Sequence, residues 1–273
     1  MGNFGFELGG VLIELGRAAQ AEGKKLWEKH IAPYKKAPAG ASKPAKSLSG
    51  NEARDLLVHL VVNGHLKIEK PVSFDAAGNL KYPKAGERVR VQPATIAGVD
   101  YDHAEAGKVS RLGSLDPAFI VLLYRFAAAL KKEWSATAIY WGGLGVGRED
   151  NPGDAHNSGR AMDFWGAATG KGTFMVQRDW GSKRVTLPNG KTSPHWPANS
   201  SKTNFRLSED DPKTKAAHNF FLFVYQFLAK EARDSSTGPS KIGEKSFIVH
   251  PDHPAAGLRP AHQNHIHFQL GAT

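Results

Sequence analysis

The sequence predicts an α+β fold in which helices flank a small, mainly antiparallel sheet, with a helical extension at the N-terminus. Two long stretches, 117–133 and 212–233, repeat apolar residues at helical spacing. Around them, short apolar runs are separated by turn residues, which is typical of antiparallel strands. Of the 273 residues, 40% are hydrophobic, so the chain can bury a real core.

Three parts are expected along the chain. Residues 1–36 form an N-terminal helical segment, because apolar residues recur there at mixed helical spacing before a basic stretch. Residues 37–50 are small, basic and contain proline, which is typical of a linker. Residues 51–273 form the main domain, with an insertion around 166–212.

The first element of the main domain is a helix. Ser49–Glu52 matches the capping box that precedes an apolar run, so we expect a helix that ends near Val62. The following stretch, 67–91, contains turn sequences at 75–78 and 84–86 and is predicted to form short strands.

The helix over 117–133 has the clearest signals. Ser114 or Asp116 can cap its start, and Pro117 suits its first turn. Its apolar face consists of Phe119, Leu122, Leu123, Phe126 and Leu130. The later elements are expected in this order: a strand over 136–141 that ends at the glycine pair 142–143, hairpins and loops over 166–212, a helix over 212–233, and strands over 246–249 and 265–270.

Composition excludes several classes of site. The chain has no cysteine, which removes disulfides, thiol nucleophiles and cysteine-based zinc sites. Its net charge of +10 favours attraction to polyanions, but no long basic run marks a nucleic-acid-binding arm. No stretch approaches the ~20 apolar residues of a membrane span. The first 16 residues contain Glu7 and Glu14 and lack a positive start, so no secretory signal is expected.

Histidines and carboxylates gather in two segments. The first holds His156 and Asp163, with Gly159 between them to allow a tight turn. The second, near the C-terminus, holds His265 and His267, which alternate along a predicted strand and face the same side about 6.6 Å apart. A catalytic zinc ion needs three protein ligands and a fourth position for water. Together the two segments supply such a set.

The alternative is that the histidines are incidental. A single histidine is usually a surface residue or a satisfied core residue, and that interpretation is the default for His30, His59, His65, His103, His195 and His218. The histidines between 250 and 267 could form a weak metal trap or a polar loop. Tryptophans 141, 165, 180 and 196 could stack on sugar rings, although core packing is expected for most of them.

The two segments resemble a known signature. His156-x-x-Gly159-x-Ala161-x-Asp163, followed downstream by His265-x-His267, is similar to the motifs of the zinc peptidases that include D-alanyl-D-alanine carboxypeptidases, murein endopeptidases and phage peptidoglycan endopeptidases. The resemblance covers roughly residues 114–165 and 246–270. It implies a sheet that carries a zinc site.

The resemblance also implies roles for individual residues. His156, Asp163 and His267 would be the zinc ligands. His265 would act as the base or stabilise the oxyanion. Arg148 is the nearest candidate for the arginine that polarises the scissile carbonyl.

The chain departs from the family pattern at two positions. Asp154 replaces a frequent serine, which leaves open whether it joins the metal ligands. Asn264 replaces a frequent glutamate and shifts the base to His265, with Glu244 or Asp252 as alternatives. The missing glutamate also leaves strict carboxypeptidase specificity open.

The expected function is a zinc-dependent peptidoglycan hydrolase, either an endopeptidase or a carboxypeptidase, that cleaves the peptide stems. Without a secretory signal, it would be made in the cytoplasm and reach the cell wall as a phage endolysin or as an antibacterial effector. A secretion machine or an immunity protein would then be its partner, whereas nucleic acid would not. Two other classes remain: a zinc-containing binding module without catalysis, by fold-level analogy with hedgehog signalling domains, and a polyanion-binding protein.

Overall fold

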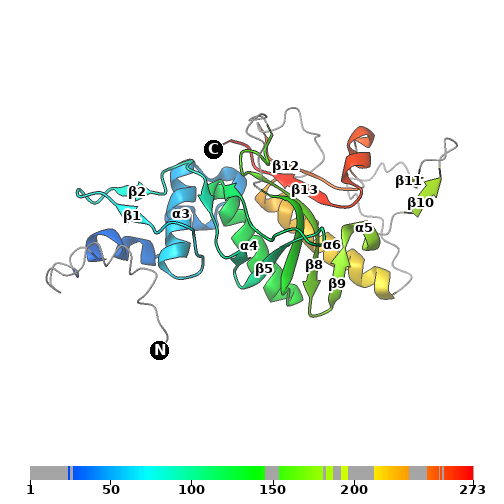
Figure 1. Cartoon of the computed structure of the whole chain (residues 1–273), viewed down its shortest axis with the longest axis horizontal. Helices are drawn as coiled ribbons and strands as arrows, with labels where there is room; N and C mark the ends of the chain where they lie inside the picture. The colour runs from blue at the N-terminus through cyan, green and yellow to red at the C-terminus, as the bar shows by residue number, and fades with distance from the viewer. Residues whose placement is uncertain are drawn as a thin grey trace.

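A seven-stranded sheet forms the centre of the fold (Figure 1). The computed structural model describes residues 24, 27–144, 154–180, 183–186, 192–195, 212–233, 245–251, 253 and 255–272. Six of the strands lie in the order β12-β13-β8-β7-β5-β4, and the seventh, β9, pairs with β8. Their bounds are β4 Thr95–Ile96, β5 Val99–His103, β7 Ala138–Leu144, β8 Ala161–Thr169, β9 Gly172–Met175, β12 Phe247–Val249 and β13 Ile266–Gln269.

The sheet is mainly antiparallel, as the sequence predicts. Among its pairings only β5 with β7 is parallel. One edge of β8 is shared, because β13 pairs with residues 161–164 and β9 pairs with residues 166–169. The strand β8 is therefore the central element, with β7 along its whole opposite edge.

Two long helices cover one face of the sheet. They are α4, Pro117–Trp134, and α6, Pro212–Glu231. Asp116 is the N-cap of α4, since its side chain accepts a hydrogen bond from the backbone N–H of Ala118 at 2.8 Å. All five residues of the predicted apolar face of α4 are buried. The Phe126 ring joins both helices to the sheet, with centroids 5.5 Å from Phe164 and 5.5 Å from Phe227.

The helix α3, Gly50–Val62, begins with the capping box that the sequence predicts. Ser49 accepts a hydrogen bond from the backbone of Glu52, and Glu52 accepts one from the backbone of Ser49. The remaining elements are η1 Ala32–Lys35, η2 Ala39–Ser42, η3 Ala45–Ser47, β1 Ser73–Phe74, β2 Leu80–Tyr82, β3 Val89–Arg90, β6 Ser114–Leu115, α5 Val176–Asp179, β10 Lys183–Thr186, β11 Thr192–His195 and η4 Ala256–His262.

Residues 37–50, which composition predicts to be a linker, pack against the main core. Ala45 and Leu48 are buried in the main core. The Glu231 carboxylate of α6 accepts a hydrogen bond from the Ala45 N–H at 2.8 Å and pairs with Arg125 of α4 at 3.0 Å. The Arg125 guanidinium also donates to two backbone carbonyls of this segment. The segment is thus hydrogen-bonded to both α4 and α6.

The strand predicted over 136–141 also differs, because β7 starts at Ala138 and continues through both glycines to Leu144. Glycine usually weakens a strand, so the pair predicted an end. Here the space beside each glycine is occupied. A Cβ at Gly142 would lie 2.2 Å from the indole nitrogen of Trp165, and one at Gly143 would lie 2.8 Å from Oδ2 of Asp163. The glycines let β7 approach these side chains.

Some expectations fall partly outside the described residues. Of the N-terminal helical segment, residues 27–30 are helical and η1 follows, while residues 1–23 lie outside. Within the predicted insertion, β8 with β9 and β10 with β11 form antiparallel pairs. None of the described helices has the length and apolar character needed to cross a membrane.

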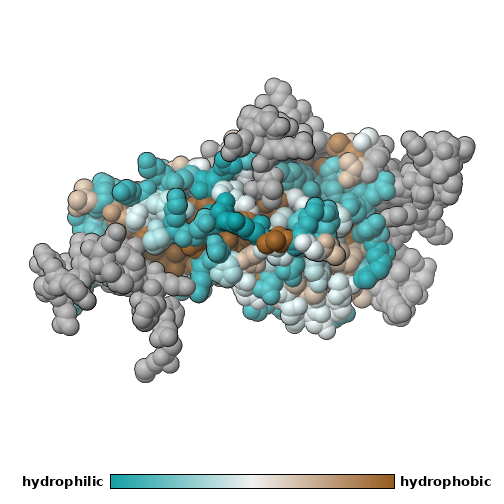
Figure 2. Space-filling view, in the orientation of Figure 1, coloured by the Kyte–Doolittle hydropathy of each residue, from teal (hydrophilic) through white to brown (hydrophobic). Residues whose placement is uncertain are grey.

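The described surface is mostly polar on the face shown in Figure 2. Among the described residues, Val109 is the exposed large hydrophobic side chain, at 79% exposure. Isolated exposed apolar residues are ordinary on a protein surface.

Candidate metal centre

A short loop before β8 positions His156. The Asp154 side chain accepts a hydrogen bond from the His156 backbone N–H at 2.9 Å, and the backbone of Gly159 closes the turn by donating to the His156 carbonyl at 2.9 Å. Asp154 thus shapes this loop. Gly159 has a φ of 68°, and a Cβ there would lie 2.4 Å from the Ser114 carbonyl oxygen. Only glycine fits this position.

The register of two strands places Asp163 beside His267. These residues lie directly opposite each other in the β8–β13 ladder, so their side chains share one face of the sheet. On β8, Met162 and Phe164 point into the core, whereas Asp163 and Trp165 alternate with them and are partly exposed. The two ligands predicted from distant segments are thereby brought together.

The donor atoms of His156, Asp163 and His267 all lie within 4.8 Å of one another, so this group could hold a metal ion. The Oδ1 atom of Asp163 is 2.9 Å from Nδ1 of His267 and 3.3 Å from Nε2 of His156. The three side chains keep 12–21% of their surface exposed. The centre is therefore sheltered but open to a ligand.

His265 lies next to this group. Its Nε2 atom is 3.4 Å from Oδ1 of Asp163, and its Nδ1 atom is 2.8 Å from the side-chain oxygen of Asn264. With the Asn264 amide in this orientation, Nδ1 of His265 carries the ring hydrogen and donates a hydrogen bond to the side-chain oxygen of Asn264. The lone pair of Nε2 then faces the carboxylate of Asp163.

His267 is oriented in a similar way by Gln269. The buried Gln269 amide donates to the Lys245 carbonyl at 2.9 Å, which turns its oxygen toward Nε2 of His267 at 3.2 Å. Nε2 of His267 must therefore donate, which leaves Nδ1 to face the centre. Nδ1 of His267 lies 2.9 Å from Oδ1 of Asp163.

Charge within the group is unevenly distributed. Burial raises the pKa of Asp163, but hydrogen bonds and charges from His156 and His267 outweigh it and hold that pKa well below its usual range. Burial lowers the pKa of His156, but the hydrogen bond and charge of Asp163 raise it above its ordinary value. Asp163 is thus a carboxylate that attracts cations.

His265 has the opposite character. Burial, together with the neighbouring histidines, lowers its pKa to about 4, against the opposing pull of Asp163. Burial likewise lowers the pKa of His262. Both rings are neutral at pH 7, and neutral imidazoles can accept a proton or bind a metal.

His262 is a neighbour that the sequence motifs did not single out. Its ring centroid lies 5.0 Å from that of His265 and 5.8 Å from that of His267. It reaches the centre from η4, where its Nδ1 atom contacts the Leu258 carbonyl at 2.6 Å. The density of histidines near the C-terminus was the only signal for it.

Several of the other residues that the sequence predicts for the site fall outside the described part of the chain. Arg148, Glu244 and Asp252 lie outside the described residues, as does Trp196. Trp141 and Trp180 are core residues, each 1% exposed. Trp165 alone of the described members of that set is partly exposed, on the same face of β8 as Asp163.

Comparison of the chain with family models, with curated proteins and with solved structures finds no match. The chemistry of the centre is therefore the basis for assigning a function.

Proposed function

We propose that the protein is a zinc-dependent hydrolase that cleaves peptide bonds in bacterial peptidoglycan. The observation that carries the proposal is the convergence of His156, Asp163 and His267, with His265 at 3.4 Å from the shared carboxylate oxygen. Three ligands beside a further neutral histidine match the needs of a hydrolytic metal site.

The donor set supports zinc as the metal. Two imidazole nitrogens and one carboxylate oxygen form the group. Such a set suits zinc, whereas calcium and magnesium prefer oxygen ligands alone. Gly143 has no side chain and so leaves room for this set of donors. A Cβ there would lie 3.1 Å from the His156 ring and 2.8 Å from the Asp163 carboxylate.

Each residue has a distinct part in the proposed mechanism. His156, Asp163 and His267 would hold the zinc ion, which when bound supplies a Lewis acid for a peptide carbonyl and a water molecule. His265 would accept a proton from the attacking water at Nε2, while Asn264 keeps its other nitrogen protonated. Arg148 remains the predicted donor to the oxyanion.

The peptide stems of peptidoglycan are the proposed substrate, on the strength of the motif resemblance. Endopeptidase and carboxypeptidase activity both remain within the proposal, because Asn264 stands where the family often has glutamate.

A second candidate is a zinc-containing module that binds without catalysis. The observation that favours it is the same short distance from His265 to Asp163. If His265 supplied a fourth donor, the site would be closed, as in structural zinc sites.

Digestion of purified muropeptides tests the first proposal. The full chain is incubated with them as isolated, after chelation, and after zinc is restored, and the products are identified by mass. Cleavage that chelation abolishes and zinc restores supports the hydrolase, and the masses identify the bond cut. Bound zinc without cleavage supports the binding module, and a chain that retains no metal contradicts both.

Substitutions separate the ligands from the proposed base. We expect His156→Ala and Asp163→Ala to lose bound zinc, measured by elemental analysis, and to lose activity. His265→Ala should keep zinc but lose activity by about 10²-fold or more if it is the base. Loss of zinc in His265→Ala would instead make it a ligand.

The control for these variants is His65→Ala, which removes an exposed histidine beside Tyr124. It should keep both zinc and activity. Full zinc and full activity in either His156→Ala or Asp163→Ala would contradict the assignment of the centre.

A further inference from the structure

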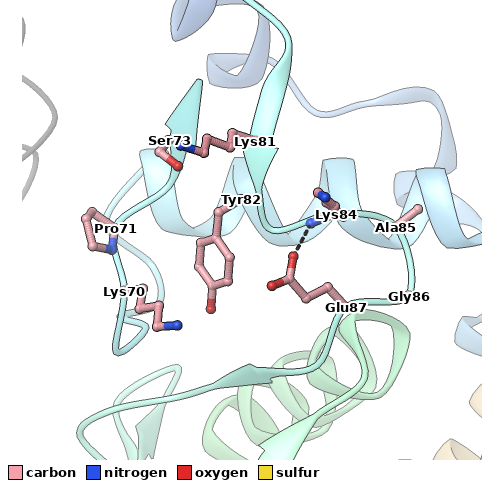
Figure 3. Close-up of a pocket in the computed structure, with 9 residues that line it drawn as sticks. All are labelled: Lys70, Pro71, Ser73, Lys81, Tyr82, Lys84, Ala85, Gly86 and Glu87. Atoms are coloured by element: carbon pink, nitrogen blue, oxygen red, sulfur yellow. Dashed lines mark hydrogen bonds between the residues drawn. The ribbon is translucent and has the colours of Figure 1, made fainter. Parts of the chain in front are cut away.

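A cavity of about 780 Å³ lies beside the β1–β2 hairpin, and no residue of the candidate metal centre lines it (Figure 3). Its volume falls within the range of small-ligand sites. One continuous stretch of chain builds it. The lining residues are Lys70, Pro71, Ser73, Lys81, Tyr82, Lys84, Ala85, Gly86 and Glu87.

The cavity is positively charged. Among the described residues, Lys70, Lys81 and Lys84 form no ion pair, and all three side chains are exposed. The one acidic lining residue, Glu87, accepts a hydrogen bond from the Lys84 backbone N–H at 2.9 Å (Figure 3). The lining therefore has three ammonium groups and one carboxylate, which already accepts a hydrogen bond, so its net charge is positive.

The other lining groups narrow the ligand class. Tyr82 is the single aromatic ring, half-buried, with the Lys70 ammonium 5.9 Å from its centroid. Ser73 adds a hydroxyl, and no arginine lines the cavity. Nucleic-acid grooves stack successive bases on several aromatic rings, which are missing from this lining. Lysine ammonium groups bind phosphate as point charges, and the Ser73 hydroxyl can both donate hydrogen bonds to and accept them from the hydroxyl groups of a polyol.

We propose that this cavity binds a segment of a phosphate-bearing polyol polymer that carries no bases. The net charge of +10 adds a long-range attraction that brings such a polymer to the surface. Placing the polymer in a cell wall rests on the proposed function, but binding itself needs neither zinc nor hydrolysis.

The cavity is connected to the metal-binding loop by a short path. Arg88 follows the lining residue Glu87, and its guanidinium donates to the Asn157 carbonyl at 2.6 Å. The next residues form β3, which pairs with β6, and the Asp116 N–H just after β6 donates to the Gly159 carbonyl at 3.0 Å. The segment that lines the cavity is therefore connected by hydrogen bonds to the loop that carries His156.

The test measures binding of the full chain to poly(glycerol phosphate) of defined length by fluorescence anisotropy. The variant Lys70→Ala/Lys81→Ala/Lys84→Ala should bind about ten-fold more weakly. Its matched control is Lys36→Ala/Lys215→Ala/Lys230→Ala, which removes the same charge from exposed positions elsewhere. The control should stay within about three-fold of the unmodified chain. Equal losses in both variants, or no binding by the unmodified chain, would overturn the proposal.

Two further arms identify the ligand and keep the two proposals separate. Single-stranded DNA with the same number of phosphates should bind more weakly than the polyol phosphate, and equal or tighter binding of DNA would overturn the assignment. Chelated protein and Asp163→Asn should bind the polymer like the untreated chain. Cleavage of muropeptides without binding of the polymer would refute only this inference. Binding of the polymer without cleavage of muropeptides would refute only the proposed hydrolase.

Discussion

At the scale of single residues, the orientation of His267 depends on a buried amide. Gln269 accepts from Nε2 of His267, and its own amide nitrogen is fixed by the Lys245 carbonyl. Partners of this kind set the ring tautomer and the basicity of a metal-binding nitrogen. Gln269 is therefore a positioning residue for the ring of His267.

We predict that Gln269→Leu lowers zinc affinity by about 10- to 100-fold, because His267 loses the acceptor that directs Nδ1 toward the centre. Competition with a chromophoric chelator measures this affinity. Gln269→Glu is the control that keeps the acceptor, since its carboxylate can still accept from Nε2 of His267, although it loses the hydrogen bond to the Lys245 carbonyl. It should bind zinc at least ten-fold more tightly than Gln269→Leu. Equal affinities for the two variants would limit Gln269 to a packing role.

The sequence identified the residues whose spacing carries a local pattern. His156 and Asp163 belong to one motif, and His265 and His267 alternate along one strand. Gln269 alternates with His267 along β13, but its role depends on the Lys245 carbonyl, which lies 24 residues away in the sequence. The position of His262 depends on how η4 packs beside β13. A glutamine or a histidine in isolation is usually unremarkable.

At the scale of elements, the loop that carries His156 depends on close contact with the start of α4. Gly159 packs against the backbone of residues 114–116 in a left-handed conformation. The Asp116 N–H also donates a hydrogen bond to the Gly159 carbonyl at 3.0 Å, so the loop is held against the start of α4. His156 lies three residues before Gly159, so a displacement of Gly159 would also move the side chain of this candidate ligand.

We predict that Gly159→Ala destabilises the fold by about 3 kcal/mol and lowers zinc retention, since the new Cβ meets the Ser114 carbonyl. Gly107→Ala is the matched control. Its φ is 80°, but nothing lies within 4 Å of a Cβ there. It should cost only about 1 kcal/mol of backbone strain and leave zinc binding intact. Urea unfolding and metal analysis measure both effects, and equal losses in the two variants would refute the packing explanation.

Helices were easier to predict than strands. The helix α4 combines a cap, a first-turn proline and one apolar face, and each signal is local. The strand β7 was cut short in prediction because glycine normally disfavours strands. Its extension through Gly142 and Gly143 depends on Trp165 and Asp163 from the neighbouring strand, which only the folded arrangement reveals.

At the scale of the whole molecule, one buried ion pair links three distant parts of the chain. Glu231 is 5% exposed and joins α6 to Arg125 of α4 and to the backbone of Ala45. The composition of residues 37–50 suggested a linker because composition reports only local stiffness. The segment packs because it forms hydrogen bonds with residues that lie 82–186 positions away in the sequence, and composition does not report such contacts.

We predict that Glu231→Ala lowers the free energy of unfolding by about 3 kcal/mol, because it leaves the Ala45 N–H unpaired and removes the carboxylate beside Arg125. The 37–48 segment should also become sensitive to limited proteolysis. Glu69→Ala, which breaks the more exposed pair with Arg90, should cost less than about 1 kcal/mol. A loss for Glu231→Ala no larger than for this control would contradict the role of the buried pair.

The pairing of β8 with β13 also imposes an order of events during synthesis. Asp163 and His267 face each other across the ladder but are 104 residues apart in the chain. While the ribosome is still making the intervening residues, the emerging polypeptide has only two of the three candidate ligands. The full candidate group can form only after β13 has emerged and paired with β8. Any catalytic power of the centre is therefore withheld from the nascent chain and appears only once the sheet is assembled.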